Sequence, residues 1–226
     1  SIGTVSPTEF IPLTERNGLI VEIGEWVIEE AVHQWTSWFP DCPTSPAVSV
    51  NVSPRQLNDT RLLQHLKSVL DNYPIPPACL ELEITESMMV GDIDKVIDLL
   101  TQISQLGVRL SIDDFGTGYS SLSYLSRLPV NTIKIDRSFI LPMLESTAKM
   151  GLVRNLITLG HDLGMQLVAE GVENREQLMV LRELGCDLIQ GYYFSPPLSA
   201  DEFMGKTSNI LSPQTRSKPP LSANSG

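Results

Sequence analysis

Two adjacent aspartates, Asp113 and Asp114, follow a segment, residues 108–112, whose side chains alternate as in a β-strand. Neighbouring carboxylates repel and raise each other's pKa unless a cation lies beside them. Glycines and small hydroxyl residues come next, from position 116 to position 121. This stretch alone is equally consistent with a metal site and with an ordinary acidic turn.

The segments around the two aspartates alternate between strand-like and helix-like periodicity. Residues 22–38 carry an apolar stripe at helical spacing, and residues 93–103 carry another that precedes Gly107. Such alternation predicts a parallel sheet with helices packed outside it, either in a closed (β/α) barrel or in an open doubly wound sheet. The expected strands are residues 47–51, 80–85, 108–112, 132–136, 166–170 and 187–190.

Each expected strand has a polar or charged side chain as its last inward-facing residue. In chain order these residues are Asn51, Glu83, Asp113, Lys134, Glu170 and Gln190. In a barrel these ends converge on one rim, where barrel enzymes carry out their chemistry. The convergence of three carboxylates and a lysine favours a metal site over a merely solvated rim.

The residue types at this rim indicate which metal it would hold. Asp, Glu and Asn supply oxygen ligands, without His or Cys, and this set is typical of Mg²⁺ or Mn²⁺. Asp113 and Asp114 could bridge and flank two ions, as in two-metal hydrolases. Lys134 would stabilise a phosphate or orient a water, and its alternative role is that of a salt-bridge partner.

The loop Gly116-Thr117-Gly118 partly matches two other motifs. A dinucleotide-binding fingerprint would need a third glycine where Ser121 stands, and the preceding acids would repel a pyrophosphate. The kinase triplet Asp-Phe-Gly occurs without a glycine-rich ATP loop. A dinucleotide-dependent oxidoreductase is therefore only a third interpretation.

Composition narrows the classes of partner. The chain has 226 residues, 42% of them hydrophobic, and a net charge of −11, so we expect a globular domain that does not bind nucleic-acid polymers or anionic membranes. No apolar run approaches the length of a membrane span. Three separated cysteines support neither a disulfide framework nor a zinc ribbon, which favours a cytoplasmic location.

The strand-end motifs carry a specific resemblance. They are Asn51-Val52-Ser53-Pro54-Arg55-Gln56, Glu83-Ile84-Thr85-Glu86, Asp113-Asp114-Phe115-Gly116-Thr117-Gly118, Lys134-Ile135-Asp136, Glu170-Gly171-Val172-Glu173 and Gln190-Gly191-Tyr192. In this order they resemble the successive motifs of the EAL-domain family of bacterial cyclic-di-GMP phosphodiesterases. The resemblance extends from residue 3 to about residue 203.

The resemblance implies a TIM-like (β/α) barrel that hydrolyses cyclic di-GMP to linear pGpG with Mg²⁺ or Mn²⁺, two ions in the intact domain. It further implies a homodimer and an upstream GGDEF or sensory domain, in a parent protein that can be membrane-anchored. It gives Lys134 and Glu170 catalytic roles and Glu86 the role of steadying the loop after the aspartates. The implied metal ligands are Asn51, Glu83, Asp113, Asp114 and Glu170. The implied substrate-binding residues are Asp136, Glu173 and Gln190.

The family's name comes from a Glu-Ala-Leu stretch on an earlier strand, and its glutamate is a metal ligand. Because the sequence starts at Ser1, after that motif, we expect the first strands and one ligand to be missing from this chain. We expect residues 1–204 to form the EAL-type domain and residues 205–226 a disordered tail. The alternative to an enzyme is a catalytically degenerate regulatory module that binds cyclic di-GMP or a protein.

Overall fold

A computed structural model describes residues 5–40, 46–89, 93–118 and 122–211 of the chain. The chain divides into two compact units, Ser1–Phe194 and Ser195–Gly226. The first unit contains one six-stranded sheet, and every pair of neighbouring strands in it is parallel. The strands are β1 (Val48–Asn51), β2 (Leu80–Thr85), β3 (Arg109–Phe115), β4 (Thr132–Ile135), β5 (Gln166–Ala169) and β6 (Leu188–Ile189).

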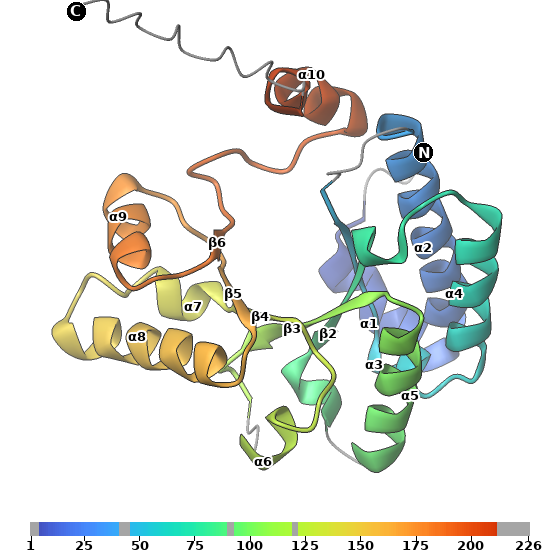
Figure 1. The fold of residues 1–226 in the computed structure, drawn as a ribbon, viewed down its shortest axis with the longest axis horizontal. Coiled ribbons are helices and arrows are strands. Elements are labelled where there is room, and N and C mark those ends of the chain that lie inside the picture. The colour runs from blue at the N-terminus through green and yellow to red at the C-terminus, as the bar shows by residue number, and fades with distance from the viewer. Residues whose placement is uncertain (1–4, 41–45, 90–92, 119–121, 212–226) are drawn as a thin grey trace, which may run out of the picture. The chain divides into compact units, whose positions relative to one another are not determined.

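Helices connect and flank these strands (Figure 1). The longer helices of the first unit are α1 (Pro7–Asn17), α2 (Leu19–Trp38), α4 (Arg61–Asn72), α5 (Ile93–Gln105), α8 (Thr147–Asp162) and α9 (Arg175–Glu183). The short ones are α3 (Pro54–Leu57), η1 (Pro77–Cys79), η2 (Glu86–Met89), α6 (Leu122–Leu125) and α7 (Arg137–Ile140). Helix α2 packs on β1, α5 on β3 and α8 on β5.

The strand order distinguishes between the two architectures that the sequence allows. The strands lie in the order β1-β2-β3-β4-β5-β6, without a reversal among the described residues. A doubly wound sheet reverses its strand order in the middle, whereas a (β/α) barrel winds in one direction. The barrel prediction is therefore confirmed, with the six described strands forming a curled parallel part of such a barrel.

The two faces of the sheet differ in chemistry, because neighbouring side chains on a strand point to opposite faces. In β2 and β3 the apolar residues alternate with polar and charged ones, and both sets are largely buried. The apolar set is fully buried and consists of Leu80, Leu82, Ile84, Leu110 and Ile112. The polar set consists of Glu81, Glu83, Thr85, Arg109, Ser111 and Asp113. One face therefore packs on helices, and the other forms a polar interior.

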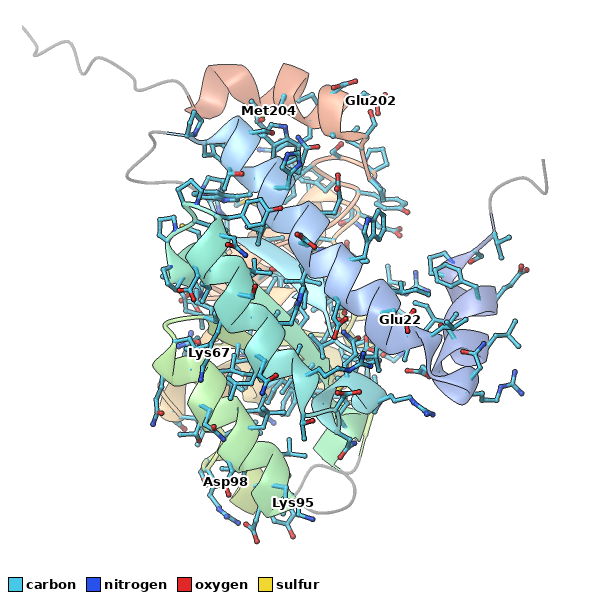
Figure 2. The ribbon with its side chains drawn as sticks, turned by 90° about the vertical axis from the view of Figure 1, so that its right-hand side faces the viewer. Glu22, Lys67, Lys95, Asp98, Glu202 and Met204 are labelled. Atoms are coloured by element: carbon cyan, nitrogen blue, oxygen red, sulfur yellow. The ribbon has the colours of Figure 1, made fainter. Side chains whose placement is uncertain are left out.

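The outer side of α2, α4 and α5 is charged (Figure 2). Glu22, Lys67, Lys95 and Asp98 are exposed there, on the side of each helix that faces away from the sheet. None of the helices within the described ranges is long and apolar enough to span a lipid bilayer.

The second unit contains α10 (Ala200–Leu211). Its first turn has a capping box, since Ser199 N donates to Glu202 Oε2 at 2.9 Å and Glu202 N donates to Ser199 Oγ at 3.4 Å. The expectation of disorder from residue 205 is wrong for residues 205–211, because the helix continues through Gly205 to Leu211. The remainder of the expected tail, residues 212–226, lies outside the described residues.

A glycine in α2 allows this helix to approach the segment after β1. A Cβ on Gly24 would lie 1.9 Å from Nε2 of Gln56, whose buried side chain closes the capping box of α3. We predict that Gly24→Ala lowers the free energy of unfolding by about 1–3 kcal/mol through overpacking. Gly151→Ala, in a helix position with open space, should instead raise it by about 0.5–1 kcal/mol. Urea denaturation of both variants tests this, and equal effects would contradict it.

Candidate active site

A buried lysine lies at the centre of the polar interior. The Nζ of Lys134, on β4, is 2.7 Å from Glu170 Oε1, 2.8 Å from Glu83 Oε2 and 3.2 Å from Asp113 Oδ1. Its side chain is only 7% exposed. The three carboxylates come from β2, from β3 and from the residue that follows β5. The lysine therefore joins four neighbouring strands at their carboxyl ends.

The charges in this group are mutually dependent. Burial alone would lower the pKa of Lys134, but its bonds to Glu170 and Glu83 raise it above the ordinary lysine value, so the ammonium stays protonated. Burial raises the pKa of Glu170, and the attraction of Lys134 offsets only part of this rise. Glu170 is consequently easier to protonate than an ordinary glutamate.

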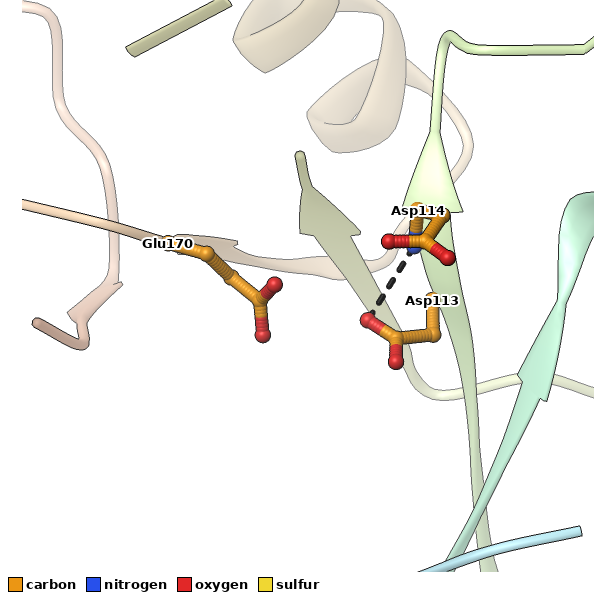
Figure 3. A group of neighbouring side chains, drawn as sticks. All are labelled: Asp113, Asp114 and Glu170. Atoms are coloured by element: carbon orange, nitrogen blue, oxygen red, sulfur yellow. Dashed lines mark hydrogen bonds between the residues drawn. The ribbon is translucent and has the colours of Figure 1, made fainter. Parts of the chain in front are cut away.

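A distortion of β3 allows two consecutive aspartates to face one site. In a regular strand Asp113 and Asp114 would point to opposite faces. The pairing of β3 with β4 shifts register between Ile112 and Phe115, and Asp114 has a φ of 54°, in the left-handed region. The backbone N–H of Asp114 donates to Asp113 Oδ1 at 3.1 Å (Figure 3). Both carboxylates thereby turn towards Glu170.

The loop after these aspartates is held by Glu86, which is buried. Glu86 Oε2 accepts hydrogen bonds from the backbone N–H groups of Gly116, at 2.8 Å, and of Gly118, at 3.2 Å. A Cβ on Gly118 would lie 2.9 Å from Glu86 Oε1, so the close approach requires glycine there. This geometry agrees with the loop-steadying role expected for Glu86, which remains a prediction.

The oxygens of Asp113, Asp114 and Glu170 form a group that could hold a metal ion. One carboxylate oxygen from each lies within 4.8 Å of the others. Burial raises the pKa of Asp114, and the carboxylates of Asp113 and Asp136 raise it further. Such a concentration of hard oxygen donors fits Mg²⁺ or Mn²⁺, because a divalent cation would relieve the repulsion between the carboxylates.

The other expected site residues are not part of this group. Asn51 is exposed at the end of β1, in register with Glu83 on β2. Asp136 caps α7 by accepting the N–H of Ser138 at 3.0 Å, and it acts electrostatically on Asp114. Glu173 and Gln190 are exposed after β5 and β6. The structure thus brings together Glu83, Asp113, Asp114, Lys134 and Glu170.

Sequence reasoning missed the polar residues nearer the amino ends of the strands. Arg109 and Glu81 form an ion pair at 3.2 Å. Ser111 is fully buried and lies along β3 between this ion pair and the lysine group. The signal was present, since Glu81 and Arg109 share the parity of Glu83 and Asp113. Both residues lie before the last inward-facing position of their strands, so the strand ends alone do not reveal them.

The chain was compared with known protein families and relatives. A family model described as EAL domain matches residues 2–197. The bifunctional diguanylate cyclase/cyclic di-GMP phosphodiesterase MucR of Pseudomonas aeruginosa is 40% identical over 202 residues, which cover 89% of this chain and 30% of MucR. The cyclic di-GMP phosphodiesterase NbdA of the same organism is 40% identical over 205 residues, covering 89% of this chain and 26% of NbdA. The chain therefore spans less than a third of either relative's length.

The fold was also compared with solved structures. The PaMucR phosphodiesterase in complex with c-di-GMP superposes with a TM-score of 0.85 at 40% identity, covering 90% of this chain and 82% of the solved one. The similarity therefore extends over most of the chain.

The repulsion among the acids predicts a pH-dependent stability. The folded-state pKa of Asp114 is raised above its ordinary value of 3.8. The protonated carboxyl of Asp114 therefore contributes stability below pH 3.8, and this contribution is lost as pH rises through the folded-state pKa. We predict that Asp114→Asn, which tolerates the left-handed backbone, raises the melting temperature of the metal-free protein at pH 7 and not at pH 3.5. Melting curves in EDTA check this. A variant that is less stable than wild type at pH 7 would contradict it.

The hydroxyl of Ser111 is buried and has no hydrogen-bond partner in the described part of the chain. Removing an unpaired buried polar group is expected to be neutral or stabilising. We predict that Ser111→Ala raises the free energy of unfolding by up to about 1 kcal/mol. The matched variant Ser53→Ala, which loses a helix cap, should lower it by about 1 kcal/mol. A loss of stability in Ser111→Ala on urea denaturation would mean that the hydroxyl has a partner.

Proposed function

Because the chain belongs to the EAL domain family, we propose that it hydrolyses one phosphodiester bond of cyclic di-GMP to give linear pGpG, with Mg²⁺ or Mn²⁺. The names of MucR and NbdA, both cyclic di-GMP phosphodiesterases, support this substrate. The solved MucR structure, which holds c-di-GMP, supports it as well.

One observation carries the proposal: the carboxylates of Asp113, Asp114 and Glu170 come within 4.8 Å of one another beside a buried, charged lysine. Asn51 and Glu83 would complete the set of metal ligands. Bound there, Mg²⁺ or Mn²⁺ would lower the pKa of a water and neutralise charge on the phosphate. This arrangement suits phosphodiester hydrolysis, in which negative charge is carried by the oxygens around phosphorus and develops on the leaving oxygen.

The side chains of this chain would divide the remaining work. The Lys134 ammonium, which stays protonated, would hold the attacking water and attract the phosphate. Glu170, whose carboxylate lies 2.7 Å from that ammonium, would accept the proton from the water. Asp136, Glu173 and Gln190, arranged around the cluster, would contact the substrate. Glu86 would keep the loop after the aspartates in place.

We extend the proposal to the whole protein. MucR combines a diguanylate cyclase with a phosphodiesterase, and this chain matches only 30% of its length. We propose that this chain likewise acts beside a GGDEF or sensory domain, and that the domain forms a homodimer.

The proposal is tested by following the conversion of cyclic di-GMP to pGpG in the purified protein with Mn²⁺. We predict that Asp113→Asn lowers kcat/KM by at least about 100-fold, because it removes an ionised ligand from the cluster. The matched variant Asp98→Asn, exposed on the outer side of α5, should retain full activity.

Two results would count against the enzyme. Full activity of Asp113→Asn would show that the cluster is not the catalytic site. If wild-type protein binds cyclic di-GMP in calorimetry with Mn²⁺ present but never turns it over, the chain is a regulatory binding module instead.

A further inference from the structure

A second cation, Arg109, lies on the same polar face as Lys134. Its Nε is 3.2 Å from Glu81 Oε2, and its Nη2 donates to Thr132 Oγ1 at 3.2 Å and to Gln166 Oε1 at 2.9 Å. Ser49 Oγ donates in turn to Glu81 Oε1 at 3.4 Å. These contacts run without interruption from β1 through β2, β3 and β4 to β5.

This network lies one to two repeats of the pleat, two to four residues, below the lysine group. Glu81 precedes Glu83 by two residues on β2, and Arg109 precedes Asp113 by four on β3. Two residues along a strand correspond to about 7 Å, so the networks are separate layers of one interior. Arg109 suits the lower layer because its planar, forked guanidinium can bond several partners in different directions at once.

The two layers differ in what a bound metal would do to them. The carboxylates around Lys134 are the proposed metal ligands, so an ion would compete with the lysine for their oxygens. None of the residues bonded to Arg109 belongs to that group. The contacts of the lower layer can therefore stay intact while the upper carboxylates change partners.

We propose that Arg109 is a positioning residue for the metal site: its bonds to Glu81, Thr132 and Gln166 hold the strands so that carboxylates from different strands meet at one ion. The inference rests on the proposed metal site. The proposed ligands come from β1, β2 and β3 and from the residue after β5, and they must keep their separation to within a fraction of an ångström for tight binding. A tie across these strands supplies that constraint.

The test measures Mn²⁺ affinity from the loss of the six-line signal that free Mn²⁺ gives in electron paramagnetic resonance. Each variant is measured far below its own melting temperature. We predict that Arg109→Met binds Mn²⁺ about 10-fold more weakly or worse, the range seen for residues that orient ligands. Gln166→Met, which keeps the ion pair of Arg109 with Glu81, should weaken Mn²⁺ binding by a smaller factor. This variant still tests the proposal if Arg109→Met does not fold.

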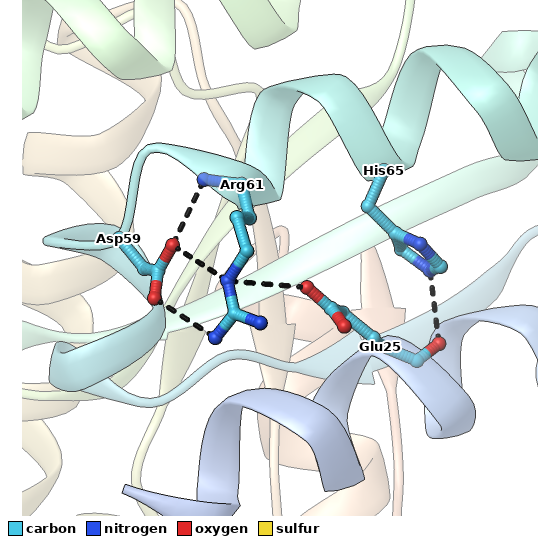
Figure 4. Close-up of polar contacts among 4 residues, drawn as sticks. All are labelled: Glu25, Asp59, Arg61 and His65. Carbon is cyan, nitrogen blue, oxygen red and sulfur yellow. Dashed lines mark hydrogen bonds and ion pairs between the residues drawn. The ribbon is translucent and has the colours of Figure 1, made fainter.

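Arg61 provides a matched control (Figure 4). It also joins two carboxylates, Asp59 at 3.2 Å and Glu25 at 3.9 Å, and links α2 to the start of α4, but its side chain is 53% exposed and outside the sheet. Arg61→Met should leave the Mn²⁺ affinity unchanged, because exposed ion pairs contribute little to stability and this one does not touch a strand.

Arg109→Lys distinguishes positioning from charge alone. A lysine can pair with Glu81 but cannot reach Thr132 and Gln166 at the same time. Weakened Mn²⁺ binding in this variant supports the proposal, whereas wild-type affinity in Arg109→Lys would show that only the charge matters and would overturn it. Equal affinity of Arg109→Met and wild type would also overturn it. If wild-type protein itself fails to bind Mn²⁺, the proposed metal site fails and this inference with it.

Discussion

The contact between the Lys134 ammonium and three carboxylates is the interaction on which the rest of the structure depends. An ammonium that is 7% exposed is stable only with charged partners, since burying a lone ion costs on the order of several kcal/mol. Glu83, Asp113 and Glu170 reach it only if four strands are parallel, in chain order and curled around a common interior. The ion pairs of Lys134 therefore require the same arrangement of strands that the fold provides.

The same group of acids has features that lower the stability of the fold but would serve metal binding. One lysine faces more carboxylates than it can neutralise, and the pKa values of Asp114 and Glu170 are raised by desolvation and by the carboxylates beside each of them. The left-handed backbone of Asp114 adds strain that the bonds of Glu86 to the following loop help to hold. Features that a purely structural protein would avoid are concentrated where a divalent cation would be bound.

Much of this could be predicted from the sequence, because strand periodicity identifies both the parallel sheet and the residue at each strand's end. Lys134 and its three partners were found in this way. The bulge that lets Asp114 face the same site as Asp113 could not be predicted from the sequence, since it depends on the pairing of β3 with β4. The layer around Arg109 requires knowledge of which strands are neighbours. Helix α10 continues past Gly205, and within it the Thr207 hydroxyl donates to the carbonyl of Phe203, a contact that composition does not reveal.

The most direct test of the central claim, that this carboxylate group is a metal site, is anomalous diffraction at the manganese edge from crystals of the protein grown with Mn²⁺. The account predicts an anomalous peak about 2 Å from oxygens of Asp113, Asp114 and Glu170, next to the Lys134 ammonium. Crystals in which these carboxylates contact only Lys134 and water, with manganese elsewhere or absent, would contradict it.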